Sequence, residues 1–218
     1  MNEFAVIFDM DGVVVDNFKY HKRAWDIFCD RHGIDLSDDF KSGIFGGTNK
    51  DHLESFFKKP LSKSEIGKYE DEKEAIYRGI YEPFIQPLNG LKVFLDELHA
   101  QNVPVALATS SPPVNVSFVL GKTGLKKSFT VITHADDVRH GKPDPEIYLL
   151  SARRLGIIPD KCFVFEDSEA GIKSAKSAGM NVIAVATTHS REEIEGVSGI
   201  IENFTEINLS YLKNFTSG

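Results

Sequence analysis

The sequence predicts an α/β protein built on a doubly wound parallel sheet, with a helical cap domain inserted into it. Short apolar runs alternate with helical segments along most of the 218 residues, which is typical of parallel strands joined by crossover helices. Residues 17–84 break this alternation, because they offer helical periods and no convincing strand. We therefore expect a core domain of residues 1–16 and 85–218 and a cap domain of residues 17–84.

Four runs rich in β-branched and aliphatic residues are predicted to be strands. Strands of a parallel sheet are covered on both faces, so they are apolar throughout rather than alternating. The four runs are Phe4–Phe8, Val103–Ala108, Cys162–Phe165 and Asn181–Ala186. The run Phe129–Thr133 is a weaker fifth candidate.

Several of the intervening helices carry start and stop signals. Asn89 is predicted to cap the helix that begins near Leu91, and Asp144 with Pro145 supplies a cap and a first-turn proline for a later helix. Gly179 follows another helix and is a typical C-terminal stop. These signals place helices between the predicted strands, as the fold class requires.

The best-defined helix of the cap is predicted to begin at Ser62, where Glu65 completes a capping box. One stripe follows at helical spacing: Ile66, Tyr69, Lys73, Ile76 and Ile80. Lys73 is the polar member, and two interpretations of it are open. Either its stem covers apolar surface while the amine reaches water, or it faces a substrate.

Composition and charge exclude several classes of function. The net charge is −7 and no long Lys/Arg cluster is present, which argues against a nucleic-acid partner. No apolar run approaches the roughly 20 residues of a membrane span, and the N-terminal segment lacks a signal-type pattern, so we expect a cytoplasmic protein. Cys29 and Cys162 lie far apart and are expected to be reduced thiols. No heptad or self-complementary stripe stands out, and we expect a monomer.

Polar side chains follow three of the predicted strands at the point where each strand ends. They are Asp9 and Asp11, Thr109 and Ser110, and Glu166 and Asp167. Open parallel sheets bind ligands beyond the carboxyl ends of their strands, so these groups are expected to meet at one edge. Four carboxylates in one place require a cation, and an oxygen-rich cluster of this kind suits Mg²⁺.

The spacing of the first two acids favours chemistry. On an extended chain Asp9 and Asp11 point to the same side, and Gly12 allows a sharp turn whose amides can surround phosphate oxygens. Paired aspartates also occur in Ca²⁺ loops and glycosyltransferases, but the preceding apolar strand disfavours a Ca²⁺ loop.

Lys142 lies between Gly141 and two prolines that rigidify the approach to a helix, where a fixed ammonium can bridge a nucleophile and a phosphoryl group. A lone lysine is otherwise usually a solvated surface residue.

Four motifs in order, FDMDGVVVD, LATSS, GKPDP and FEDSEAG, cover nearly the whole chain. With these motifs the sequence resembles the haloacid dehalogenase (HAD) superfamily of phosphotransferases. The helical insertion, the segment Tyr20–Trp25 and the adjacent acids Glu166 and Asp167 resemble its β-phosphoglucomutase-like branch. That branch includes both phosphosugar mutases and phosphatases of small metabolites.

The resemblance implies a role for each motif residue. Asp9 would be the nucleophile that becomes an aspartyl-phosphate, and Asp11 would be the general acid and base. The phosphoryl group would be bound by Thr109, Ser110 and Lys142. Mg²⁺ would be held by Asp9, the Asp11 carbonyl and Asp167, with Glu166 as a further ligand in a position where the family varies.

The cap is expected to select the substrate, through His21, Thr48, Asn49 and Lys73. A mutase needs a second phosphate site, to which an arginine is suited, and Asn49 stands at the position that we align with that arginine. The sequence also departs from the mutase pattern at Pro112 and Pro113 and at Asn17. We therefore expect a phosphatase acting on a small phosphorylated metabolite such as a sugar phosphate. A β-phosphoglucomutase-type mutase is the alternative, and a non-catalytic metabolite-binding module is a remote one.

Overall fold

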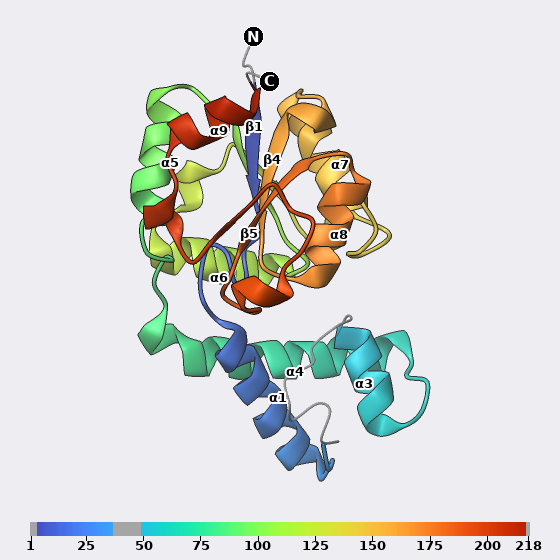
Figure 1. The fold of residues 1–218 in the computed structure, drawn as a ribbon. Coiled ribbons are helices and arrows are strands. Elements are labelled where there is room, and N and C mark those ends of the chain that lie inside the picture. The colour runs from blue at the N-terminus through green and yellow to red at the C-terminus, as the bar shows by residue number, and fades with distance from the viewer. Residues whose placement is uncertain (1–3, 37–48, 217–218) are drawn as a thin grey trace. The chain divides into compact units, whose positions relative to one another are not determined.

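The structure is a computed structural model that describes residues 4–36 and 49–216. The chain divides into two compact units. One consists of residues 1–16 and 85–218, and the other of residues 17–84. Figure 1 shows the sheet in the first unit and helices alone in the second.

The core unit contains a six-stranded parallel sheet in the order β3-β2-β1-β4-β5-β6. The strands are β1 (Ala5–Phe8), β2 (Val105–Ala108), β3 (Val131–Thr133), β4 (Cys162–Glu166), β5 (Asn181–Val185) and β6 (Gly199–Ile201). The predicted fold class is confirmed. Strand β6 was not predicted, because a three-residue strand at the edge of the sheet, paired with β5, leaves almost no pattern in the sequence.

Both faces of the sheet are covered, as Figure 1 shows for α5 (Leu91–Ala100) and α9 (Leu209–Thr216) on one face and α7 (Glu146–Leu155) and α8 (Glu169–Ser177) on the other. Successive strand residues serve opposite faces. Ile7 belongs to the aliphatic core that includes Ala152 of α7 and Ala175 of α8. Phe8 stacks on Phe165 at 5.0 Å on the other face. These two cores hold β1 and β4 in place. The polar residues that follow the two strands are therefore held in fixed positions as well.

The helix boundaries of the core correct one prediction. Asn89 does not cap α5, because Gly90 precedes the helix in a left-handed conformation, with no side-chain cap. A Cβ on Gly90 would lie 2.5 Å from the Thr205 backbone nitrogen, so a close approach of two segments decides how this helix starts. The prediction for α7 is shifted by one residue: Pro145 is the N-cap and makes no side-chain cap, while Oδ1 of Asp144, one residue earlier, accepts from the Glu146 amide at 2.9 Å. The remaining core helix is α6 (Pro113–Thr123).

The cap unit consists of α1 (Phe18–His32), α3 (Asn49–Phe57) and α4 (Lys63–Tyr81) in its described part. The capping box at the start of α4 is confirmed: the Ser62 hydroxyl accepts from the Glu65 amide, and the Glu65 carboxylate accepts from the Ser62 amide. Trp25 and Phe28 of α1 and Leu53 of α3 are buried, and the rings of Trp25 and Phe28 pack edge to face with 5.5 Å between their centroids.

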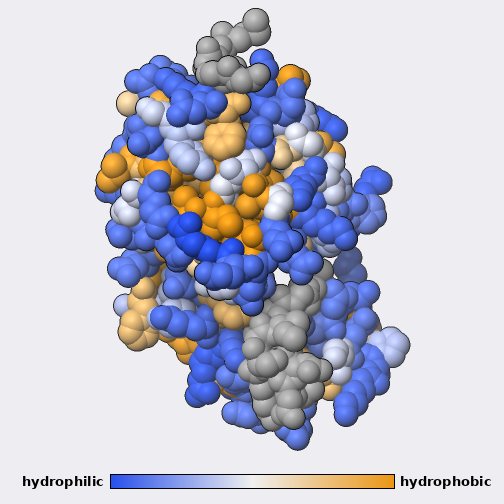
Figure 2. Space-filling view, in the orientation of Figure 1, coloured by the Kyte–Doolittle hydropathy of each residue, from blue (hydrophilic) through white to orange (hydrophobic). Residues whose placement is uncertain are grey.

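The visible surface is mainly hydrophilic, and Figure 2 shows one group of hydrophobic residues on the core unit. Among the residues described, no helix combines the length and apolar character that crossing a membrane requires. Cys29 and Cys162 are buried free thiols.

Candidate active site

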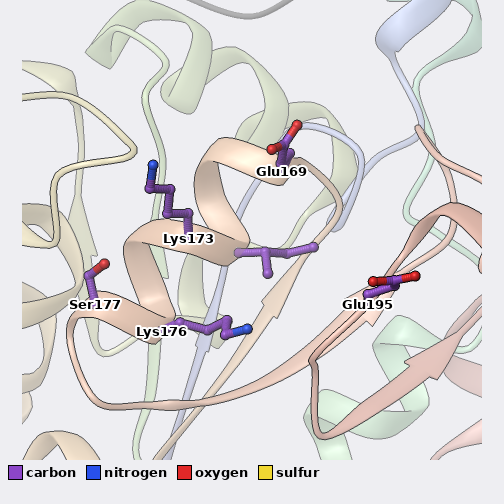
Figure 3. A pocket seen from close by; sticks show the side chains of 6 residues that line it. Glu169, Lys173, Lys176, Ser177 and Glu195 are labelled. Atoms are coloured by element: carbon purple, nitrogen blue, oxygen red, sulfur yellow. The ribbon is translucent and has the colours of Figure 1, made fainter.

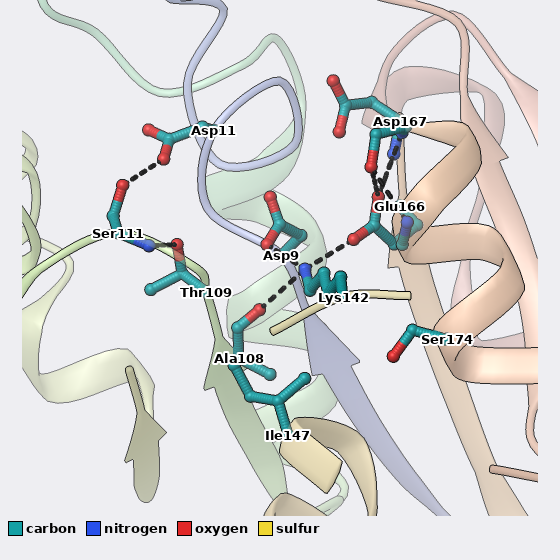
Figure 4. Close-up of polar contacts among 12 residues, drawn as sticks. Asp9, Asp11, Ala108, Thr109, Ser111, Lys142, Ile147, Glu166, Asp167 and Ser174 are labelled. Carbon is teal, nitrogen blue, oxygen red and sulfur yellow. Dashed lines mark hydrogen bonds and ion pairs between the residues drawn. The ribbon is translucent and has the colours of Figure 1, made fainter. Parts of the chain in front are cut away.

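A buried aspartate and a lysine whose side chain is 7% exposed meet at the carboxyl edge of the sheet (Figure 4). Asp9 directly follows β1, and its amide donates to the Phe165 carbonyl of β4 at 3.0 Å, so the ladder continues one residue past the strand. Lys142 comes from the loop between β3 and α7. Its Nζ lies 2.5 Å from Oδ1 of Asp9, 2.6 Å from Oε1 of Glu166 and 3.4 Å from the Ala108 carbonyl oxygen. The ends of three neighbouring strands, β2, β1 and β4, therefore converge on the ammonium group that the loop supplies.

Glu166, the last residue of β4, is fully buried and tightly held. Its Oε1 accepts from Lys142 and from the Tyr148 hydroxyl at 2.8 Å, and its Oε2 accepts from the Asp167 amide at 2.9 Å. A Cβ on Gly171 of α8 would lie 1.7 Å from that Oε1. The carboxylate thus fills the space that a side chain at residue 171 would need.

The charges of the site shift one another's pKa values. Burial raises the pKa of Asp9 to about 8; Lys142 acts against this shift, and Glu166 and Asp11 add to it. Burial also raises the pKa of Asp167 well above its usual range, with Glu166 and Asp9 adding to the effect. Burial acts in the same direction on Glu166, but Lys142 and the hydrogen bonds outweigh it and lower that pKa. Burial would lower the pKa of Lys142, yet Asp9 and Glu166 outweigh it and raise that pKa well above its usual range.

Asp11 is held by a residue that the sequence analysis did not single out. The Ser111 hydroxyl donates to Oδ2 of Asp11 at 2.5 Å, and the Ser111 amide donates to the Thr109 hydroxyl at 3.0 Å. Thr109 is buried directly after β2, whereas the predicted phosphate-binding residue Ser110 is exposed. The LATSS motif contains both serines and does not distinguish them, and it is the turn after β2 that brings residue 111 rather than 110 towards Asp11.

The turn after Asp11 leaves room for Asp167. Gly12 has a φ of +82°, and a Cβ there would lie 1.9 Å from Oδ2 of Asp167. The Thr188 hydroxyl donates to the same carboxylate oxygen, and the Thr187 hydroxyl donates to the Gly12 carbonyl at 2.6 Å. The segment after β5 therefore fixes both the first turn and the Asp167 carboxylate.

The chemistry of these donors fits a divalent cation. Four carboxyl groups, those of Asp9, Asp11, Glu166 and Asp167, lie at this edge with the ammonium of Lys142 (Figure 4). Burial raises the pKa of Asp9 and of Asp167, and the neighbouring carboxylates add to the shift. Asp9 and Glu166 both contact Lys142, and the carboxylates of Asp9, Glu166 and Asp167 are the candidate ligands. Among the described residues, the His, Asp and Glu side chains that bring three ligand atoms within 4.8 Å of one another are His140, Asp144 and Glu146. This set contains none of the predicted metal ligands.

The cap unit contains a polar cluster that joins three of the predicted substrate residues. The Nζ of Lys73 lies 2.7 Å from Oε1 of Glu74 and 2.9 Å from Nδ1 of His21. The side-chain amide of Asn49 donates to the same Glu74 oxygen at 3.0 Å. The His21 ring stacks on Tyr77 with 3.8 Å between centroids. The interpretation in which the Lys73 amine reaches water is wrong, because its side chain is 3% exposed. Thr48 lies outside the described residues.

A cavity of about 430 Å³ lies against α8, and Figure 3 shows the side chains that line it. Its walls come from α8 and the loop after β5: Glu169, Ile172, Lys173, Lys176, Ser177 and Glu195. None of these residues belongs to the predicted site.

The fold and the site together define a class of protein, an α/β enzyme that presents a buried aspartate–lysine pair and a second aspartate beyond its parallel strands. The chain belongs to the haloacid dehalogenase-like hydrolases, whose family pattern matches residues 6–185. The predicted family is confirmed.

Individual relatives include phosphatases and a mutase. The chain is 32% identical to the phosphorylated carbohydrates phosphatase of Thermotoga maritima, over 82% of this chain and 83% of the relative. It is also 32% identical to the β-phosphoglucomutase of Bacillus subtilis, over 83% of this chain and 82% of the relative. The crystal structure of a HAD hydrolase of family IA, variant 3, from Entamoeba histolytica superimposes with a TM-score of 0.91 at 32% identity, and the match covers all of both chains.

Proposed function

We propose that this protein is a Mg²⁺-dependent phosphatase that hydrolyses a small phosphorylated metabolite, a sugar phosphate, through an aspartyl-phosphate on Asp9. The observation that carries the proposal is the 2.5 Å approach of the Lys142 ammonium to the buried Asp9 carboxylate. An ammonium in this position offsets the charge that phosphoryl transfer gathers around the nucleophile.

The residues divide the reaction into two displacements. Asp9 attacks phosphorus, the bond from phosphorus to the ester oxygen breaks, and Asp11 gives its proton to the leaving oxygen. Water then attacks the aspartyl-phosphate while Asp11 takes up its proton, which releases inorganic phosphate and restores Asp9. The hydrogen bond from Ser111 to Asp11 orients that carboxyl group for both proton transfers.

The proposed metal ligands are the Asp9 and Asp167 carboxylates and the Asp11 carbonyl. When bound, Mg²⁺ supplies charge neutralisation for the phosphoryl oxygens and favours the ionised forms of the two carboxylates. Thr109 and the amides that follow β2 bind the phosphoryl oxygens in this proposal.

The cap cluster supports water rather than a second sugar phosphate as the acceptor. Asn49, at the position aligned with the mutase arginine, is uncharged and is bound to Glu74. The positive charge of Lys73 is paired with the same glutamate. A site for a second phosphate needs unpaired positive charge, and in this cluster a carboxylate accompanies the ammonium.

The test is a screen of sugar phosphates and p-nitrophenyl phosphate with Mg²⁺, run on the wild type, Asp9→Asn and the matched surface control Asp160→Asn. We expect turnover in the wild type and the control and none in Asp9→Asn. Acid-quenched enzyme should carry phosphate on the peptide that contains Asp9. A coupled assay with β-glucose 1-phosphate and its bisphosphate distinguishes the mutase, since isomerisation without phosphate release would replace our proposal. Unchanged turnover in Asp9→Asn would remove Asp9 from the mechanism.

A further inference from the structure

The carboxylate of Glu166 accepts five hydrogen bonds. Its Oε1 receives the Lys142 ammonium at 2.6 Å and the Tyr148 hydroxyl at 2.8 Å. Its Oε2 receives the Asp167 amide at 2.9 Å and both the amide and the hydroxyl of Ser168 at 3.0 Å. A carboxylate offers about four lone-pair sites, so these five donors use its whole capacity as an acceptor.

The donors also fix where the carboxylate points. Both Oε2 partners follow Glu166 in the chain and hold it at the start of α8, whereas the Tyr148 hydroxyl reaches it from the neighbouring helix α7. Tyr148 is fully buried, and the centre of its ring lies 5.0 Å from the Lys142 Nζ. Tyr148 therefore contacts both members of the ion pair, the carboxylate through its hydroxyl and the ammonium through its ring.

We propose that Glu166 is the anchor of Lys142 rather than a metal ligand, and that Tyr148 is a positioning residue that acts through Glu166. A lysine ammonium on a flexible stem is held in one place only when its acceptors are themselves fixed. Here Glu166 fixes the ammonium opposite Asp9, and Tyr148 fixes Glu166 without touching Asp9. The inference rests on the proposed function, in which Lys142 assists the attack by Asp9.

The positioning role is tested with Tyr148→Phe, which removes the hydroxyl and keeps the ring. The matched control is Ser151→Ala, because the Ser151 hydroxyl is also buried on α7 but donates to the Ile147 carbonyl and is hydrogen-bonded to the Thr133 hydroxyl. On p-nitrophenyl phosphate we expect Tyr148→Phe to lower kcat about 10-fold with KM unchanged, as for a lost hydrogen bond to a charged group. The control should retain wild-type kcat. Equal effects of the two substitutions would overturn the positioning role.

A double-mutant cycle separates this role from a loss of packing. If Tyr148 acts through Glu166, then Tyr148→Phe should lower kcat less than about 2-fold in a Glu166→Gln background. An undiminished 10-fold loss in that background would contradict the proposed route.

The metal claim has a readout that needs no turnover. Direct titration with Mn²⁺ compares Glu166→Gln with Asp167→Asn, and each substitution removes one negative charge, so the long-range electrostatic effect is matched. We expect Asp167→Asn to weaken binding at least about 10-fold more than Glu166→Gln. Equal weakening, or a larger effect of Glu166→Gln, would make Glu166 a ligand and overturn the inference. If the wild type binds Mn²⁺ but hydrolyses no phosphate ester, the proposed function fails while this result still stands.

Discussion

Replacing Gly171 by alanine should destabilise the protein, although the same change in a helix normally stabilises it. Gly171 lies in the first turn of α8, and a Cβ there would lie 1.7 Å from Oε1 and 1.9 Å from Cδ of Glu166. Glu166 cannot move aside cheaply, because Lys142, Tyr148 and the start of α8 hold it. The substitution therefore breaks a buried ion pair.

The magnitude follows from two opposing effects. Gly→Ala inside a helix gains about 1 kcal/mol of stability. Disrupting a buried ion pair costs about 3–5 kcal/mol, so the net loss is about 2–4 kcal/mol. For a chain of this size each kcal/mol lowers Tm by about 2–4 °C, which gives a decrease of about 4–16 °C. This is a large part of an ordinary folding free energy of about 5–15 kcal/mol.

The measurement is thermal unfolding followed by far-ultraviolet circular dichroism, with Gly121→Ala as the matched control. Gly121 lies in α6 of the same unit, is exposed, and has nothing within 4 Å of an added Cβ. We expect opposite signs, with Gly121→Ala neutral or slightly stabilising and Gly171→Ala destabilising. If both variants melt at or above the wild-type temperature, the Glu166 carboxylate does not occupy the space beside residue 171.

Three further outcomes are expected. Lys142→Met should lower kcat on p-nitrophenyl phosphate about 100- to 1,000-fold, as for the loss of one fixed electrostatic stabiliser, and a loss below 10-fold would contradict its placement beside Asp9. The Arg154 hydrogen bond lowers the pKa of Asp137 to about 2, so Asp137 contributes stability above its unfolded pKa of about 3.9 and loses it as the pH falls towards 2. In urea unfolding at pH 6, we expect the wild type to be only about 0.5–1 kcal/mol more stable than Asp137→Asn, because the ion pair is partly exposed. This difference in the free energy of unfolding should become smaller at pH 3. A difference that stays constant would refute the assignment. Glu74→Gln removes the carboxylate that pairs with the buried lysine before it, and should cost about 3 kcal/mol in the same assay. A change below 1 kcal/mol would show that this pair is not buried.

Local patterns in the sequence were sufficient for the fold class and for the nature of the site. Runs such as Phe4–Phe8 are apolar because both faces of a parallel sheet are covered, and this requirement is visible without knowing which helices cover them. Asp9 and Asp11 are recognisable because they follow such a run at a spacing of two. The capping box at Ser62 and Glu65 depends only on neighbours three residues apart, so it too was predicted correctly.

Features that depend on contacts between distant segments were missed. The short strand β6 exists because β5 offers it an edge, and the start of α5 is decided by the approach of Gly90 to Thr205. Ser111 reaches Asp11 only because β2 lies beside β1, and no local pattern favours it over Ser110.

The sequence by itself determined which ionisable groups gather beyond the strands, because the strand ends follow from apolar patterning and the carboxyl ends of parallel strands share one edge of the sheet. The tertiary structure alone decided what each group faces: Glu166 turns to Lys142 since Tyr148 from α7 and the absence of a side chain at Gly171 leave it that one position. A carboxylate is oriented by the donors around it, and these donors come from parts of the chain that only folding brings together.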